Sequence, residues 1–265
     1  SKPPFQDVQA LVREHTGHQV YWNQGTTGDH QAAAAVQSLL SHDLTAESAV
    51  EIALLNNPGL QARFEEIGIA QADLVQAGLL RNPQFSASWR FADKSPGQTD
   101  AEYAGSQGFL DLLVIPLRKK VAAAELERPQ ATVAHAVVDL TADVTVALYQ
   151  VQAQQQLLSR LKLIVEVNQA GAELAQRQHD AGTINDLDLA NRQSIYSQSK
   201  LDVAQARITL TADREQLNRL MGVWGDATRW TTAAQLPAIP EREISLDHLE
   251  SMAIRDRLDL AAKRQ

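Results

Sequence analysis

The sequence predicts a mainly helical protein, built around one long antiparallel helical hairpin with a single β-hairpin beside it. Apolar residues between about 117 and 221 recur in steps of three and four, the spacing of packed helices. Residues 85–91 instead alternate apolar and polar side chains, as a β-strand does. Aromatic residues make up only 5% of the chain, which favours long helices packed through small side chains over a thick globular core.

The composition excludes several classes of protein. The 265 residues carry a formal net charge of −8, which argues against a nucleic-acid partner because phosphate binding needs clustered Lys and Arg. The absence of cysteine excludes disulfides and thiolate metal sites. The longest apolar stretch, residues 109–117, is far shorter than the roughly 20 residues of a membrane helix. A crossing of a bilayer would therefore need β-strands closed into a barrel.

Two segments of the chain resemble each other. Residues 44–63 align without a gap with residues 244–263, at a constant offset of 200. Thr45 and Ser245 each precede an acidic residue in a first helical turn, which is an N-cap signal. The similarity fits either a duplication or chance resemblance of two amphipathic helices. A duplication with so long a unit implies a longer protein, and the chain starts without an apolar signal segment, so we expect any signal peptide to be already removed.

The first part of the chain has two expected units. Residues 1–43 are predicted to be a small separate element, with a helix over residues 5–15 and a brief strand from Gln19 to Trp22. Residues 44–82 are predicted to be a helix that Pro58 breaks or kinks and that Pro83 ends.

Residues 83–116 are predicted to form the β-hairpin, with residues 93–108 as its loop. The apolar side chains of its two strands would share one face: Phe85, Trp89, Phe91, Leu110, Leu112 and Val114. From this pattern alone, an ordinary hairpin on a soluble core fits better than a lipid-facing one. Two strands cannot close a barrel, so a membrane role would need oligomerisation, a second repeat or both.

Residues 117–221 are predicted to form the long helical hairpin. The apolar stripe from Val133 to Val165 has a mean period of 3.5 residues, which is typical of helices packed as in coiled coils. The first helix of the hairpin, from Leu117 to about Ala181, has roughly 60 residues and would make a rod of about 90 Å. Gly182 suits the left-handed position that ends a helix, and Asn185, with Asp188 three residues later, suits the cap of the next one.

The returning helix carries two adjacent seams, so it needs neighbours on two sides, as in a helical sheet rolled into a tube. The first, here called the Leu201 seam, contains Leu187, Ala190, Ser194, Ser197, Leu201, Ala204, Ile208 and Thr211. The second, the Val203 seam, contains Leu189, Tyr196, Val203, Leu210 and Leu217.

This order of elements resembles the outer-membrane factor family, the TolC-like exit ducts of Gram-negative efflux pumps and type I secretion. The resemblance covers nearly the whole chain and departs from the family at Leu258, where proline is common. It makes residues 222–243 an equatorial linker and residues 244–265 the start of a second repeat. The segments that carry it are residues 44–49, 53–58, 181–189 and 220–222.

The resemblance implies a homotrimer in the outer membrane, with one shared β-barrel in contact with lipid and a long periplasmic α-barrel. It implies a passive duct that is not an enzyme, needs no cofactor, works with a periplasmic adaptor protein and an inner-membrane pump, and carries small molecules or metal ions. The turn near residue 182 would be the tip where the adaptor docks. Charges there either close the aperture, bind cations or are solvated helix-end charges. The tip residues are Arg177, Asp180, Gly182, Thr183, Asn185, Asp186 and Asp188.

Other functions find less support in the residues. No phosphate loop, H-E-x-x-H or G-x-S-x-G pattern is present. His15 and His18 could share a metal only on a continuous helical turn, which Gly17 breaks. The alternative function is a soluble periplasmic coiled-coil adaptor or scaffold, but an adaptor would have β-rich flanks on both sides of its hairpin. Residues 5–22 faintly resemble those of heavy-metal-efflux members, which makes metal ions the first expectation for cargo.

Overall fold

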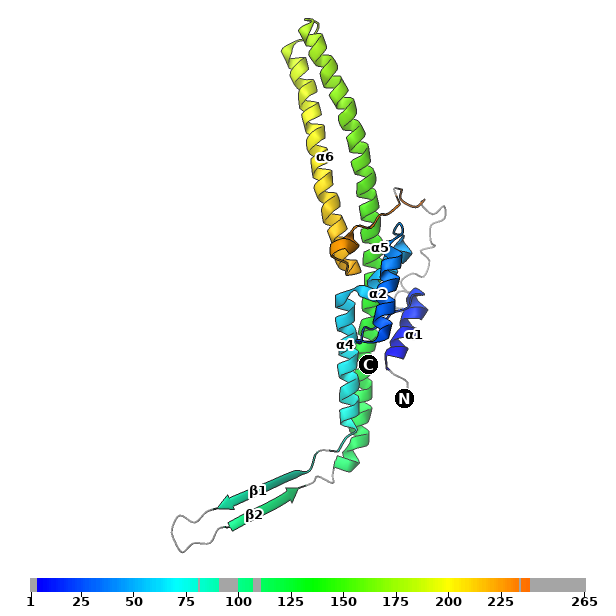
Figure 1. Ribbon diagram of the computed structural model, residues 1–265, viewed down its shortest axis with the longest axis vertical. Helices are drawn as coiled ribbons and strands as arrows, with labels where there is room; N and C mark the ends of the chain where they lie inside the picture. The colour runs from blue at the N-terminus through cyan, green and yellow to red at the C-terminus, as the bar shows by residue number, and fades with distance from the viewer. Residues whose placement is uncertain (1–3, 81, 91–99, 107–110, 234, 239–265) are drawn as a thin grey trace, which may run out of the picture.

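The computed structural model describes residues 4–80, 82–90, 100–106, 111–233 and 235–238, and it confirms a mainly helical fold with a small β-hairpin. The helices form a rod, with α5 running along its length, α6 packed on one half of α5 and α4 on the other (Figure 1). The hairpin projects from the end of the rod beyond α4. In chain order the elements are α1 (Pro4–Thr16), α2 (Thr27–Leu40), α3 (Ala46–Asn56), α4 (Pro58–Ala77), β1 (Gln84–Arg90), β2 (Asp100–Ser106), α5 (Asp111–Asp180), α6 (Asp186–Met221) and a 3-10 turn (Gly225–Thr228).

Helix α5 has 70 residues, which corresponds to about 105 Å. The predicted stripe from Val133 to Val165 is buried or half-buried, so its 3.5-residue period does mark the packed face. The helix begins at Asp111, earlier than predicted, and contains Pro116 and Pro129. Each proline removes one backbone hydrogen bond, and the rest of the long ladder and the packing of α4 keep the helix continuous.

The predicted break between α3 and α4 is confirmed. Asn57 ends α3 and caps α4, where its Oδ1 accepts a hydrogen bond from the backbone N–H of Leu60 at 2.8 Å. Pro58 occupies the first turn of α4, where no helical N–H is needed. Thr45 caps α3 as predicted, since its Oγ1 accepts from the N–H of Ser48 at 3.1 Å.

A tight joint connects this break to the end of α6. The side-chain amide of Asn56 donates to the carbonyls of Met221 at 3.2 Å and Gly222 at 2.6 Å, and that of Asn57 donates to the carbonyl of Leu220 at 2.8 Å. Gly222 has φ of 68°, and a Cβ there would lie 2.4 Å from the Asn56 carbonyl oxygen. Only glycine therefore allows this approach.

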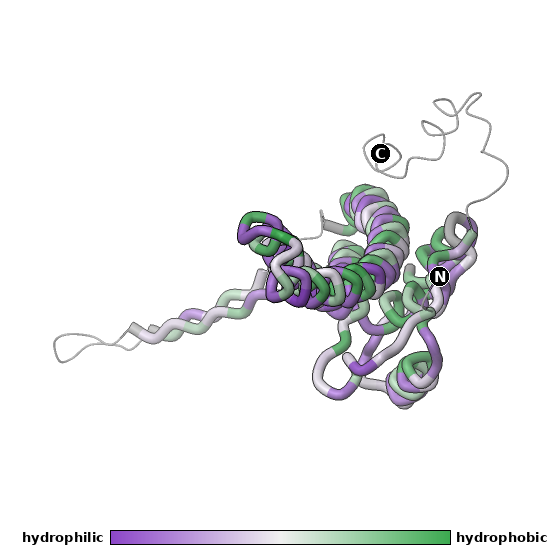
Figure 2. Tube along the Cα trace, turned by 90° about the horizontal axis from the view of Figure 1, so that it is seen from above, coloured by the Kyte–Doolittle hydropathy of each residue, from purple (hydrophilic) through white to green (hydrophobic). Residues whose placement is uncertain are grey.

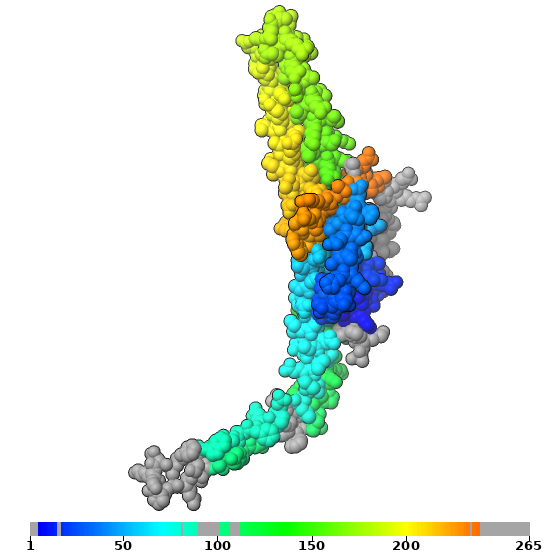
Figure 3. Space-filling model, in the orientation of Figure 1, coloured from blue at the N-terminus to red at the C-terminus, as the bar shows by residue number. Residues whose placement is uncertain are grey.

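The main core lies at the middle of the rod, around the joint. Its largest fully buried side chains come from helices far apart in sequence, and the N-terminal elements and the segment after α6 gather around it (Figure 3). Beyond α6 the chain returns to the start of α3, where the N–H of Leu44 donates to the carbonyl of Thr231 at 2.8 Å. Core members are Phe64, Leu44, Ile52, Leu54, Ile67, Leu148, Leu217, Met221, Val133 and Val137.

The N-terminal residues are not the separate element that was predicted. Val8, Val12 and Val20 are buried in the main core, and α1 packs against α4 and α5. The predicted strand from Gln19 to Trp22 is also wrong, because side chains rather than a partner strand contact this segment: the amide of Gln9 donates to the Val20 carbonyl at 3.1 Å.

The turn before α2 is organised by Asp29. Its carboxylate accepts hydrogen bonds from the Tyr21 hydroxyl at 2.9 Å and from the backbone N–H of Gly25 at 2.6 Å and Thr26 at 3.0 Å. Loss of hydration raises the pKa of the Asp29 carboxyl, but these donors together outweigh it and lower the pKa below 3.8. The carboxylate therefore stays charged and caps α2.

By length and composition alone, one stretch of α5 is apolar enough to cross a membrane. It was not identified from the sequence, because polar residues interrupt its apolar residues. Within Leu112–Asp180, an 18-residue window has a mean hydropathy of 1.4 and few charges. Core helices pass the same test, and Val133, Val137 and Val144 of α5 are fully buried. In the single chain 33% of this window is buried, and one such helix is weak evidence of a membrane span.

Three glycine-to-alanine variants separate backbone strain from close packing. We expect Gly222→Ala to lower the free energy of unfolding by about 2 kcal/mol or more, because it adds a collision to a positive φ. Gly182→Ala, with φ of 70° and open space, should lower it by about 1 kcal/mol. Gly171→Ala, inside α5 with open space, should raise it by about 0.5–1 kcal/mol. Urea unfolding followed by circular dichroism measures all three, and equal effects of the first two would contradict a tight joint.

Candidate functional site

The turn between α5 and α6 is the far end of the rod. Helix α5 ends in a Schellman motif, in which the N–H of Gly182 donates to the His179 carbonyl at 2.8 Å and that of Thr183 to the Gln178 carbonyl at 2.9 Å. Gly182 adopts the left-handed conformation expected from the sequence, with φ of 70°. The Thr183 hydroxyl also donates to the Gln178 carbonyl, at 2.8 Å.

Helix α6 begins with the predicted cap. The Oδ1 of Asn185 accepts from the backbone N–H of Asp188 at 2.8 Å. Asp186 and Asp188 both lie in the first turn, where the helix dipole stabilises negative charge. Stabilisation of the helix start thus explains these two carboxylates without a ligand.

The structure brings all seven predicted tip residues together, but it does not pair their charges. Asp180 accepts a hydrogen bond from Gln176 at 2.9 Å, and Arg177 forms no ion pair with any residue that the structure describes. The basic partner in this turn is His179, whose Nε2 lies 2.6 Å from Asp186 Oδ1. His179 was missed from the sequence, although a histidine three residues before a helix-ending glycine is a recognisable signal for a charged C-terminal turn.

At the opposite end, β1 and β2 form an antiparallel hairpin with two unlike faces. Phe85 pairs with Gly105, Ala87 with Tyr103 and Trp89 with Ala101, so one face is apolar. The rings of Trp89 and Tyr103 meet edge to face, with 6.1 Å between their centroids. Phe85 is 82% exposed, Trp89 56% and Tyr103 72%, so the described residues leave this face uncovered. The other face is polar, with the pairs Ser86–Ala104 and Ser88–Glu102.

The second strand differs from the predicted one. It is formed by Asp100–Ser106, inside the segment expected to be a loop. Leu112 and Val114, expected in this strand, lie in α5. Phe91 and Leu110 lie outside the described residues. Leu112 and Val114 are only two apolar positions, which are too few to distinguish the period of a strand from that of a helix. Pro116 suggested that the helix begins after it, but α5 begins at Asp111 and continues through Pro116.

The two seams of α6 have different environments. The Val203 seam faces α5, with Val203 and Leu217 buried. The Leu201 seam is exposed along most of its length, and Leu201 and Ile208 are 62% and 65% accessible. Helix α5 likewise exposes Leu157, Ile164, Val167 and Leu174. Each long helix therefore has an apolar stripe that no element of the described structure covers.

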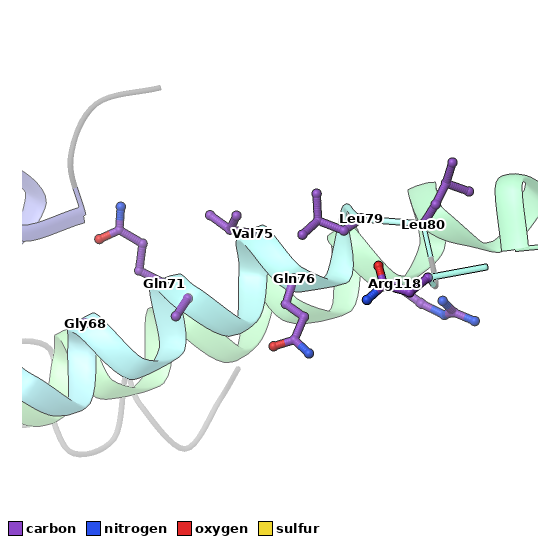
Figure 4. Close-up of a pocket in the computed structure, with 9 residues that line it drawn as sticks. Gly68, Gln71, Val75, Gln76, Leu79, Leu80 and Arg118 are labelled. Carbon is purple, nitrogen blue, oxygen red and sulfur yellow. The ribbon is translucent and has the colours of Figure 1, made fainter. Parts of the chain in front are cut away.

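A groove of about 750 Å³ runs along α4 toward the start of α5 (Figure 4). Val75, Leu79 and Leu80 are exposed on its walls, with Gln71, Gln76 and Arg118 around them. The groove is open and lined by apolar and amide groups. Its chemistry suits packing against another polypeptide better than catalysis.

The described residues contain no group of three His, Cys, Asp or Glu side chains that could hold a metal ion. The tip carboxylates and His179 thus do not form such a group in the described part of the chain. Arg214, near the joint, stacks over the Trp230 ring at 3.8 Å and donates to the Trp230 carbonyl, and its burial lowers its pKa. These contacts fasten the segment after α6 to the core.

The geometry defines a class of protein: an elongated helical rod with a β-hairpin at one end and a helical turn at the other (Figure 1). Seen along the rod, the hairpin points away from the helices (Figure 2), and both long helices expose apolar side chains. The family described as "Outer membrane efflux protein" matches residues 49–223. The chain belongs to this family.

Individual relatives agree with this assignment. The cobalt-zinc-cadmium resistance protein CzcC of Cupriavidus metallidurans is 26% identical over 221 residues, which are 78% of this chain and 50% of that protein. The solved structure of CusC has a TM-score of 0.62 at 18% identity, covering 77% of this chain and 49% of CusC. The outer-membrane channel OprN has a TM-score of 0.62 at 19% identity, covering 86% of this chain and 54% of OprN. The chain thus spans about half the length of the proteins it matches.

Proposed function

We propose that this chain supplies part of the wall of a trimeric duct that crosses the outer membrane and extends through the periplasm. The observation that most supports this proposal is the β-hairpin with an exposed aromatic face at the end of a helical rod. The aromatic face suits lipid and the serine-rich face suits a watery lumen, which is the alternation of membrane β-barrels. Two strands need neighbours to close a barrel, and further copies of the chain and its second repeat would supply them.

The cargo that we propose is metal cations, which leave passively. The similarity to a protein named for cobalt, zinc and cadmium resistance supports this class of cargo. The chain is acidic overall, at −8, so a duct built from it would favour cations over anions.

The proposed partners are a periplasmic adaptor protein and an energised inner-membrane pump, reached at the α5–α6 turn. Gly182 and Asn185 fix the shape of this turn, while Arg177 and Asp188 present charges without an ion pair among the described residues. Unpaired charges on a rigid turn suit polar recognition of another protein.

The alternative of a soluble adaptor or scaffold finds less support. A soluble protein would expose Phe85, Trp89 and Tyr103 together on one strand face, which favours aggregation. The family assignment also points to the outer membrane.

The two faces of the hairpin provide a direct test of membrane insertion. We expect Phe85→Glu or Trp89→Glu to reduce the amount of protein in the outer membrane, since a carboxylate that faces lipid is unfavourable, by less than the roughly 2–4 kcal/mol that a Lys or Arg costs at the bilayer midplane. Ser86→Glu and Ser88→Glu, on the polar face, are the matched controls and should insert normally. Quantitative immunoblots of separated membranes measure both. Equal loss from the two faces would exclude a lipid-facing role for the aromatic face.

The Leu201 seam provides a test of assembly. Leu201→Ser with Ile208→Ser should weaken the trimer, because burial of each apolar side chain contributes about 1–2 kcal/mol per subunit. The control, Leu201→Met with Ile208→Val, keeps the seam apolar and should preserve the trimer. Electron microscopy of the detergent-extracted protein distinguishes threefold tubes from single rods. Intact tubes in the serine variant would show that the seam does not hold the assembly.

The cargo can be tested in cells. We expect deletion of the gene to lower tolerance to cobalt, zinc or cadmium, and a wild-type copy to restore it. A copy with Trp89→Glu should not restore it, because the duct would not reach the membrane. Growth at graded metal concentrations is the measurement. Unchanged tolerance to all three metals in the deletion strain would refute the proposed cargo.

A further inference from the structure

The polar face of the β-hairpin carries more acid than base. In the register of the two strands, Ser88 pairs with Glu102 and Arg90 with Asp100. The second pair contains one base and one acid, so Glu102 is the acid in excess. Residues 84–106 as a whole also contain one more acid than base. An ion pair formed inside the hairpin would therefore leave this excess of negative charge unchanged.

The aromatic face determines where Glu102 points. Successive residues of a strand alternate between its two faces, and Glu102 precedes Tyr103 of the aromatic face. Glu102 is thus on the opposite, polar face, and it is exposed. Strand β1 runs away from the rod and β2 returns to it, so the pair Ser88–Glu102 lies in the half of the hairpin farther from the helices (Figure 1).

In the proposed duct this place is the water-filled lumen near the outer end of the barrel. Each subunit of the trimer would carry one Glu102 at the same level, and rings of acidic side chains select cations in channels. The field of such a ring extends about 8 Å at physiological salt, so it attracts cations and repels anions along the wall. Substitutions on the lumen side of membrane barrels change selectivity for this reason.

We propose that Glu102 determines the preference of the duct for cations at its outer end. This role rests on the proposed function, because only an aromatic face in contact with lipid turns Glu102 toward the lumen. Ser88 is the natural position for a probe of this charge. The Cβ atoms of directly opposite residues in an antiparallel pair are about 4.5–5.5 Å apart.

Cysteine labelling of the full-length protein in cells tests the proposal. The 265 residues contain no cysteine, so Ser88→Cys adds a thiol beside Glu102, and the parent protein gives the background. A cationic and an anionic methanethiosulfonate reagent, added from outside, report the local potential through the ratio of their reaction rates. Because a carboxylate about 5 Å away attracts one reagent and repels the other, we expect Glu102→Gln to lower the cationic-to-anionic ratio roughly three-fold.

Two further variants in the Ser88→Cys background isolate the charge of Glu102. Glu102→Asp keeps the carboxylate and should keep the ratio. Glu66→Gln removes an exposed acid from α4, on the rod rather than the hairpin, and should leave the ratio unchanged. A ratio that Glu102→Gln does not lower, or that Glu66→Gln lowers equally, would overturn the role of Glu102.

Ala87→Cys distinguishes this failure from failure of the duct itself. Ala87 pairs with Tyr103 on the aromatic face, so lipid should shield its thiol from both charged reagents. Labelling of Ala87→Cys as fast as that of Ser88→Cys would place the aromatic face in water and overturn the proposed function. Slow labelling of Ala87→Cys, with a ratio at Ser88→Cys that ignores Glu102→Gln, would overturn only the inference about Glu102.

Discussion

The two asparagines at the break between α3 and α4 hold the centre of this structure together. The last carbonyls of any helix lack partners within the helix, and at the end of α6 they lie in the core. The Asn56 amide reaches the Met221 and Gly222 carbonyls, and the Asn57 amide reaches that of Leu220, while Asn57 also caps α4. One dipeptide therefore satisfies helix ends from two parts of the chain that are more than 160 residues apart. Gly222 makes this possible because any side chain there would strike the Asn56 backbone.

Because α5 passes this joint without interruption, the joint fixes the positions of α4 and α6 along α5. Helix α4 extends toward the β-hairpin on one side, and α6 extends toward the tip on the other (Figure 1). The 36 residues of α6 place the tip about 54 Å from the joint. Loops could not keep the two ends of the rod at so fixed a separation, whereas a continuous helix with a packed centre can. The hairpin end and the tip can thus differ fully in chemistry while sharing one core.

The sequence predicted well where local chemistry decides the structure. Thr45, Pro58, Gly182 and Asn185 begin, break or end helices through their own backbone or side-chain properties. The 3.5-residue period of the α5 stripe was likewise visible in the sequence, because it reflects the spacing of packed helices. The failures have a different origin. Strand β2 has one large apolar side chain, Tyr103, and its partner strand, rather than its own composition, makes it a strand. The start of α5 was obscured by Pro116. At the tip, the glycine and the caps were found, but the link between His179 and Asp186 requires knowing how the turn folds back.

The distribution of apolar surface supports the proposed assembly with other chains. Its own core is complete around the joint, where Phe64, Leu148 and Leu217 are fully buried. Away from the joint, α5 and α6 share a single seam, and the stripes around Leu201 on α6 and Ile164 on α5 face outward. An isolated two-stranded hairpin is marginal in water, and a pair of helices with exposed heptad stripes attracts further helices. The centre can therefore fold within one chain, while in the proposed duct both ends would be stabilised by assembly. This division suits a tube, since its walls are continuous only when each unit supplies what its neighbours lack.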